Sequence, residues 1–274
     1  MSNVRYKGET GRTPSPSIFG DLGKLFDDAH AGRCVYLFDD FIQHRIHANA
    51  QASGGYYTYQ DTGVLISSLT GPADLDDAIG VFRISGNDAD NDEGHIQFTS
   101  EVFNCDNATG NTAKILFETR IKKSTVADNG VAFFAGLING PVAADHLIDD
   151  TGVLGDFAAI GFRLLQDNGE ELDTVYKAAG QTQAEVQANC ATIVANTWVN
   201  LGFAYRPAAD DNNKITFYVN GAPQTTKVTK TNMDAATFPE GEALAAAILT
   251  KVGTVSLTDT FDIDWVACAQ YFDG

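Results

Sequence analysis

Short apolar segments rich in β-branched and aromatic residues recur along most of this chain, separated by polar turns. The clearest pair comprises residues 198–205 (WVNLGFAY) and 214–221 (KITFYVNG), joined by the polar connection RPAADDNN. Such residues favour strands, and the connection has the composition of a turn. The second segment ends at Asn220-Gly221, which tolerates positive φ and closes a tight turn. The pattern predicts an antiparallel hairpin.

Further strands are predicted on both sides of this hairpin. Residues 114–121 alternate, which places Phe117, Thr119 and Ile121 on one face and Glu118 and Arg120 on the other. Residues 131–138 are continuously apolar, as expected for a strand buried on both faces. The other predicted strands are 35–38, 56–59, 64–66, 81–84, 95–98, 158–165, 173–176 and 261–271.

The hairpin also resembles a known fold family. A tryptophan, an apolar strand, a polar turn and then ITFYVNG at residues 215–221 are similar to the late hairpin of concanavalin-like and laminin-G-like jelly rolls. The resemblance covers roughly residues 35–272 and implies an all-β, two-sheet antiparallel jelly-roll sandwich. Since this sandwich serves lectins, glycosidases and virion proteins, the resemblance does not determine function.

Two segments remain ambiguous. Residues 181–191 are compatible with a short helix or a strand. Residues 242–249 (EALAAAIL) consist of strong helix formers, so propensity alone predicts a helix. The jelly rolls that the chain resembles have a strand at this late position, which favours a strand here.

Residues 1–33 differ from the rest of the chain. They are rich in glycine and proline and have no sustained apolar period, so we expect an extended N-terminal arm with one short helical turn near 22–29. Residues 34–274 then form the sandwich. The arm is basic in an acidic chain, and its contacts with a partner or with the sandwich are predicted to use these residues: Arg5, Tyr6, Lys7, Arg12 and Phe19.

Composition excludes several classes of function. The chain has 36 acidic and 18 basic side chains and a net charge of −18, so nucleic-acid binding is not expected. No apolar run is long enough to span a membrane. The N-terminus has no apolar signal region, so we expect no secretion. The four cysteines show no metal-ligand spacing and are predicted to be reduced and mostly buried.

The candidate catalytic pair is Asp262 and Asp264 on the last predicted strand. Their spacing puts both carboxylates on one face, as in concanavalin-like glycosidases, where one acid is the nucleophile and another the acid/base. The glutamates of those enzymes are missing here, and Val266 stands four residues after Asp262. The pair is therefore interpreted as structural, and the protein is expected not to be an enzyme. A glycoside hydrolase or lyase remains the less favoured alternative.

Two further patterns point to ligand binding. Asp88, Asp90 and Asp92 alternate like the oxygen ligands of a calcium loop, although Glu93 and Thr99 depart from the helix–loop–helix pattern. A solvated acidic turn is the favoured interpretation. Tyr57 and Tyr59 share a strand face and are candidates for stacking on a sugar, with a core position as the alternative. The five histidines form no metal set.

The opening GETGRTPSPSIFGD at residues 8–21, followed by this sandwich, resembles structural proteins of tailed-phage virions. That resemblance implies a capsid decoration protein, made in the host cytoplasm and located in the virion. Its arm would bind the major capsid protein, another shell protein or a sister subunit of a homo-oligomer. Avidity over a lattice makes modest contacts sufficient. The alternative is a lectin-like module that binds surface glycans, with calcium as a possible cofactor.

Overall fold

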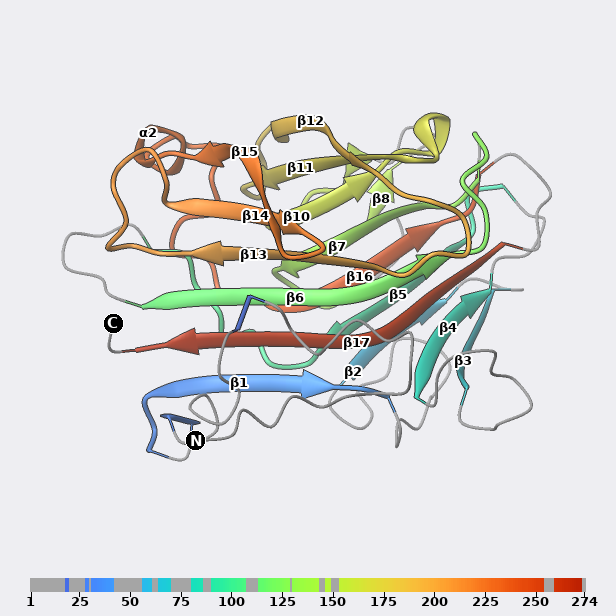
Figure 1. Cartoon of the computed structure of the whole chain (residues 1–274), viewed down its shortest axis with the longest axis horizontal. Helices are drawn as coiled ribbons and strands as arrows, with labels where there is room; N and C mark the ends of the chain where they lie inside the picture. The colour runs from blue at the N-terminus through green and yellow to red at the C-terminus, as the bar shows by residue number, and fades with distance from the viewer. Residues whose placement is uncertain are drawn as a thin grey trace.

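The computed structural model describes residues 18–19, 28–29, 31–41, 56–60, 64–69, 80–85, 90–106, 113–128, 130–142, 146–148, 153–253 and 259–272. These residues form two packed antiparallel sheets, here named sheet A and sheet B, and Figure 1 shows sheet A lying in front of sheet B. The predicted all-β two-sheet sandwich is therefore confirmed.

Sheet A contains both the first and the last strand. Its path runs β15 (Ala222–Val228), β14 (Ile215–Val219), β13 (Val199–Tyr205), β6 (Lys114–Lys123), β17 (Thr260–Tyr271), β4 (Val81–Ser85) and β3 (Leu65–Leu69). β1 (Cys34–Asp39) pairs with the second half of β17, and β4 pairs with its first half. The long β17 thereby joins two groups of strands into one surface.

Sheet B packs behind sheet A. Its path runs β12 (Ala184–Thr192), β11 (Glu171–Lys177), β10 (Ala159–Leu164), β7 (Ala132–Ile138), β16 (Ala245–Lys251), β5 (Glu93–Phe98) and β2 (Tyr56–Gln60). The short strands β8 (Leu147–Ile148) and β9 (Val153–Leu154) form a separate hairpin. A 3₁₀ turn η2 (Gln166–Asn168) and the helix α2 (Lys230–Met233) complete the described elements.

The main core lies between the two sheets. Alternate residues of β6 and β13 point into it, including Phe117 and Phe203, whose rings stack with centroids 5.4 Å apart. The intervening residues of both strands point away from sheet B. The alternation predicted for 114–121 is thus observed, with Glu118 and Arg120 on the outer side.

Both ambiguous segments are strands. β16 is fully buried between β5 and β7, so tertiary pairing overrides its helical propensity. β12 lies at the edge of sheet B. The predicted hairpin is also correct: β13 pairs with β14, and Asn220 (φ 50°) and Gly221 (φ 77°) close the following turn into β15.

Two facing glycines let the centre of sheet B pack closely. Gly136 on β7 is the cross-strand partner of Gly161 on β10. The ring of Phe134 lies over both, with its Cζ 2.8 Å and 2.9 Å from where their Cβ atoms would be. Gly161→Ala is therefore expected to lower the free energy of unfolding by about 1–3 kcal/mol. Chemical denaturation measures this, and Gly180→Ala, whose site is open, tests positive φ alone.

The four cysteines are free, as predicted, and three of them are buried. Within the described residues, no helix is long and apolar enough to cross a membrane.

Candidate functional site

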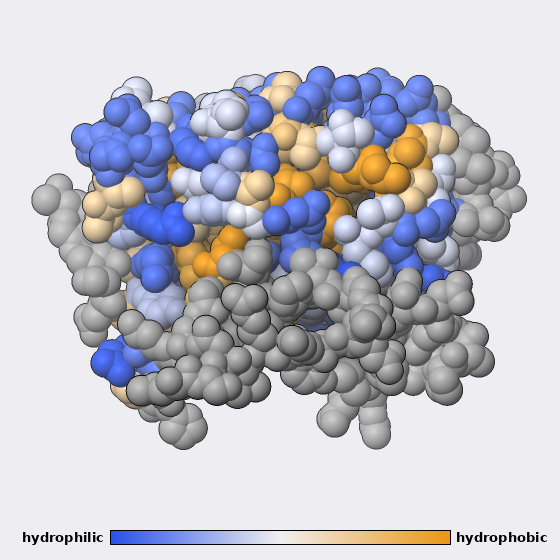
Figure 2. All heavy atoms as spheres, in the orientation of Figure 1, coloured by the Kyte–Doolittle hydropathy of each residue, from blue (hydrophilic) through white to orange (hydrophobic). Residues whose placement is uncertain are grey.

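The surface of sheet A that points away from sheet B, here called the outer A face, carries the candidate site. It has an apolar half, built on small residues of β13 and β17, and a charged half further along β6. Figure 2 shows this side of the molecule, on which hydrophobic residues reach the surface between polar ones. The apolar cluster consists of Phe19, Cys34, Leu116, Ala204, Trp265, Ala267 and Ala269.

A segment in the middle of the predicted arm, residues 18–19, is anchored in the apolar half. Phe19 is only 6% exposed, and its ring meets that of Tyr36 on β1 edge-on, with centroids 6.1 Å apart. The backbone N–H of Ile18 donates to Oε2 of Glu118 over 3.1 Å. Phe19, predicted as a partner contact, therefore binds its own sandwich. The other predicted arm residues, Arg5, Tyr6, Lys7 and Arg12, lie outside the described residues.

The charged half begins with Asp262. Its carboxylate accepts two parallel hydrogen bonds from Arg83 on β4, at 2.6 Å and 2.8 Å, and lies 3.3 Å from Nζ of Lys122 on β6. The aspartate side chain is 2% exposed, whereas the two cations are 29% and 23% exposed. The carboxylate is thus enclosed by two positive charges that reach toward solvent.

Asp264 has a separate cation. It lies at a β-bulge where the pairing of β17 with β6 shifts, and its carboxylate is 2.5 Å from Nη1 of Arg120. Both side chains are nearly inaccessible, at 5% and 2%. The Arg120 guanidinium also lies 4.7 Å from the ring centroid of Trp198, as does Lys122. Asp264 lies on the same face as Asp262, as the sequence predicted, and the bulge places Trp265 on this outer face as well.

Asn200 on β13 is the cross-strand neighbour of Arg120. It is 1% exposed, and within the part of the chain that the structure describes neither Oδ1 nor Nδ2 of its side chain has a hydrogen-bond partner; the same holds for Nε of Arg120. A desolvated polar group without a partner costs about 1–3 kcal/mol. Two donors and one acceptor are therefore left unused beside the point where the arm is anchored.

The predicted calcium turn connects the two sheets, because β4 belongs to sheet A and β5 to sheet B. Asp88 lies outside the described residues, Asp90 is exposed, and Asp92 holds the turn through its backbone carbonyl, which accepts from Val252 over 2.8 Å. No group of three metal-ligating side chains occurs among the described residues. Calcium binding at this turn stays a prediction.

The outer face of sheet B brings together two histidines that the sequence did not connect. His95 on β5 lies 3.2 Å from Glu93 and accepts the backbone N–H of Thr250 at Nδ1, so the proton resides on Nε2. The ring of His146 lies 5.8 Å from that of His95. Tyr59 packs against the same cluster, 5.6 Å from His95.

This packing favours the core interpretation of Tyr59 over a sugar platform. For Tyr57, the structure describes the backbone in β2 and its pairing with Gln97, and stacking on a sugar stays untested.

The connection that contains β8 and β9 covers this face of sheet B. Lys251 donates to the carbonyl of Leu147 over 2.8 Å, and Lys177 donates to that of Gly155 over 2.5 Å. Gln97 binds the connection twice, donating to Gly140 and accepting from Val142. Leu147, Leu154 and Phe157 of this connection are buried against the sheet.

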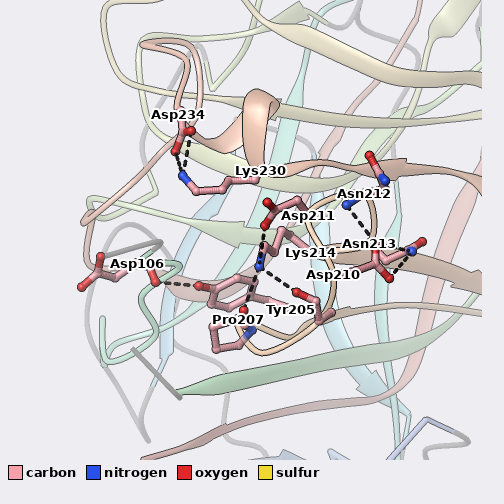
Figure 3. A network of polar contacts seen from close by, with 11 residues as sticks. Asp106, Tyr205, Pro207, Asp210, Asp211, Asn212, Asn213, Lys214, Lys230 and Asp234 are labelled. Carbon is pink, nitrogen blue, oxygen red and sulfur yellow. Dashed lines mark hydrogen bonds and ion pairs between the residues drawn. The ribbon is translucent and has the colours of Figure 1, made fainter. Parts of the chain in front are cut away.

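The acidic turn between β13 and β14 is a closed polar network, shown in Figure 3. Asp210 accepts from the backbone N–H of Asn212 and from Nδ2 of Asn213, and these hydrogen bonds lower its pKa. Lys214 donates to two carbonyls of the same turn and lies 3.3 Å from Asp211. These contacts explain the acidic run as the structure of a turn.

Sequence reasoning identified the aspartates but missed their partners. Arg83, Lys122 and Asn200 were not singled out, because their roles depend on which strands pair and in which register. The one available signal was the alternation of 114–121, which placed Glu118 and Arg120 on the outer side.

Comparison with known proteins gives the fold. No family model matches this chain, and no curated protein matches its sequence. An endo-1,3-beta-glucanase from Streptomyces sioyaensis matches with a TM-score of 0.55 and 15% identity, over 87% of this chain and 97% of the glucanase. The carbohydrate recognition domain of Emp47p matches with a TM-score of 0.51 and 15% identity, over 89% of this chain and 98% of that domain. Arcelin-5, a lectin-like defense protein from Phaseolus vulgaris, matches with a TM-score of 0.52 and 11% identity, over 88% of this chain and 99% of arcelin-5.

These similarities assign the concanavalin-like, lectin-like jelly-roll fold to the chain, as the sequence predicted. At such low identity they give the fold alone.

Proposed function

We propose that this protein is a non-enzymatic structural protein of a virion, a capsid decoration protein that binds the shell through its N-terminal arm. The observation that carries the proposal is the anchor at Ile18 and Phe19, which fixes the arm to the outer A face at these two residues. An arm that is anchored at these residues can present the preceding Arg5, Lys7 and Arg12 to an acidic partner surface.

The state of the two aspartates supports a non-enzymatic role. A glycosidase needs one carboxyl group as an acid and a second as a base or nucleophile, both within reach of the substrate. Asp262 and Asp264 are instead buried and each is paired with a cation. They are well placed to hold β17 against β4 and β6.

In this proposal, binding is strong because many copies of the protein bind one shell, although each single contact is weak. Each copy on a shell would contribute one arm, and linked copies bind with an effective concentration far above that of the free protein. The partner is the major capsid protein or another shell protein, with a homo-oligomer as the bound form.

The test removes residues 1–17 and keeps the anchor. The truncated protein is expected to keep its strand content and melting temperature but to lose co-sedimentation with purified shells through a density gradient. A full-length variant carrying Arg5→Gln, Lys7→Gln and Arg12→Gln controls for chain length and should weaken binding at physiological salt. Retention of the truncated protein on the shells would contradict the proposal.

A second candidate function is carbohydrate binding, favoured by the lectin-like fold. Asp88, Asp90 and Asp92 would hold calcium, and Tyr57 would offer a ring to surface glycans. Glycan arrays with and without calcium test this candidate. Calcium-dependent signals that Asp90→Asn abolishes would support it, and their absence would leave the arm as the sole binding element.

A further inference from the structure

One end of the sandwich is closed by a short segment, residues 103–106, that contacts both sheets. This is the end at which β6 begins and β13 and β17 finish, at the left of Figure 1. Phe103 exchanges both backbone hydrogen bonds with Leu244, which directly precedes β16 of sheet B. The next residues are held by sheet A, so the segment passes from one sheet to the other.

Two side chains of sheet A fix the segment. Gln270 on β17 accepts the backbone N–H of Asn104 over 3.0 Å and donates to its carbonyl over 3.4 Å. Tyr205 on β13 donates its hydroxyl to the carbonyl of Asp106 over 2.6 Å. Both strands pair with β6 at Ile115, so Gln270, Ile115 and Tyr205 form one row across the sheet. The segment therefore crosses β17, β6 and β13 along this row.

The neighbouring row contains one of two buried cysteines. Cys268 stands two positions before Gln270 on β17 and is the cross-strand partner of Phe117. Its side chain belongs to the core between the sheets, as does that of Cys105, which lies between the two fixed residues of the segment; both are 0% exposed. Burial raises the pKa of Cys268 well above 9.0, and the next largest contribution is the charge of Cys105, so the two thiols lie within electrostatic range of each other.

The other two cysteines are remote from this pair. Cys34 on β1 belongs to the apolar cluster of the outer A face, so sheet A separates its side chain from that of Cys268. Cys190 lies on β12, the edge strand of sheet B that contacts β15. In sheet A, β14, β13 and β6 separate β15 from β17. Of the four cysteines, the fold therefore brings Cys105 and Cys268 together.

We infer that Cys105 and Cys268 are a latent disulfide pair, reduced as the chain folds and joined later by an oxidant of the disulfide class, such as oxidised glutathione. One protein thiolate attacks a sulfur of the oxidant and releases one glutathione. The second thiolate then attacks the protein sulfur of the mixed disulfide and releases the other. The two protein thiols lose two electrons and two protons, which end on the two glutathione molecules. This inference goes beyond the proposed function and does not depend on it.

The bond would tie the segment that closes this end of the core to the last strand of sheet A. Because the two cysteines are far apart in the chain, the bond restricts the unfolded state strongly and so stabilises the fold. Burial also keeps both groups as thiols, which react slowly, so oxidation requires this end of the sandwich to open.

Equilibration with glutathione tests the pair. The full-length protein is held in a buffer of oxidised and reduced glutathione, with urea below the unfolding transition so that the end of the sandwich opens. Two of its four thiols are expected to disappear, with the loss of two hydrogen atoms by mass spectrometry and a linked peptide that joins Cys105 to Cys268. The melting temperature should rise by about 10 °C.

Two matched variants give the controls. Cys34→Ala with Cys190→Ala keeps the pair and should oxidise as the unaltered protein does. Cys105→Ala with Cys268→Ala keeps the other two thiols and should form no intramolecular disulfide.

Persistence of all four thiols at equilibrium would overturn the inference, because it would mean that the Cα atoms of Cys105 and Cys268 cannot come within the roughly 7 Å that a disulfide requires. A bond that involves Cys34 or Cys190 would overturn it as well. The same holds for a product that carries glutathione on one cysteine and has no internal bond.

Discussion

Replacing Asp264 by alanine is expected to lower the free energy of unfolding by about 3–5 kcal/mol, because it leaves the charge of Arg120 buried without its partner. Both side chains are nearly inaccessible, so the guanidinium cannot turn to water without disturbing Trp198, whose ring it covers. Urea denaturation at neutral pH measures the loss.

Two further variants show whether the loss of stability comes from the buried ion pair or would follow any substitution in β17. Asp262→Ala should cost less, because Arg83 and Lys122 are partly exposed and can be solvated after the change. The double variant Arg120→Met with Asp264→Leu removes both charges and should recover most of the stability. A double variant as unstable as Asp264→Ala would mean that the pair is needed for more than mutual neutralisation.

A milder variant of Asp262 bears on the proposed function. If the aspartates only hold strands together, Asp262→Asn should stay folded and bind shells as the unaltered protein does. A loss of shell binding with an unchanged melting temperature would move the binding site from the arm to the charged half of the outer A face.

The sequence was sufficient for the pattern of strands because that pattern is local. Alternation over 114–121 gave the side of the sheet on which Glu118 and Arg120 lie, and the spacing of Asp262 and Asp264 gave their common face. The neighbour of a side chain on the adjacent strand is not determined by the local sequence. Asn200 faces Arg120 only because β13 pairs with β6 in one particular register.

The segment at 242–249 illustrates the opposite failure of local reasoning. Its alanines and leucines favour a helix in isolation. In the fold, β16 pairs with β5 on one side and β7 on the other and is buried along its whole length. Its assignment as a strand came from resemblance to a fold, and propensity alone would have been wrong.

Alkaline pH is expected to destabilise the protein steeply above about pH 9. Burial raises the pKa of Cys105 from 9.0 to about 12, and burial together with the neighbouring Cys105 raises that of Cys268 well above 9.0. The folded state thus keeps protons that the unfolded state releases. The free energy of unfolding falls by about 1.4 kcal/mol per pH unit for each such thiol, until the folded pKa is reached.

Lys123 changes the pH dependence of stability in the opposite direction, over a lower pH range. Burial lowers its pKa from 10.5 to about 8, so between these values the unfolded state holds the proton and stability rises with pH. Above pH 10.5 this gain ends, while Tyr271, whose pKa burial raises from 10.0 to about 12, adds to the loss. Cys190, whose pKa is raised from 9.0 to about 12 by burial and by the nearby Asp173, contributes to the loss as well, so stability is expected to be greatest between about pH 8 and 9 and to fall beyond it.

Urea denaturation under reducing conditions at pH 8, 9, 10 and 11 follows this profile. Changing both Cys105 and Cys268 to alanine lowers stability at every pH, because it leaves cavities, so the informative quantity is the slope. Above pH 9 the slope should be less steep by about 2.7 kcal/mol per pH unit. Cys190→Ala should also lessen the slope, by less than the double variant, because burial and the nearby Asp173 raise the pKa of this one thiol from 9.0 to about 12. An unchanged slope in the double variant would mean that the two buried thiols lose their protons in the folded state as readily as in the unfolded one.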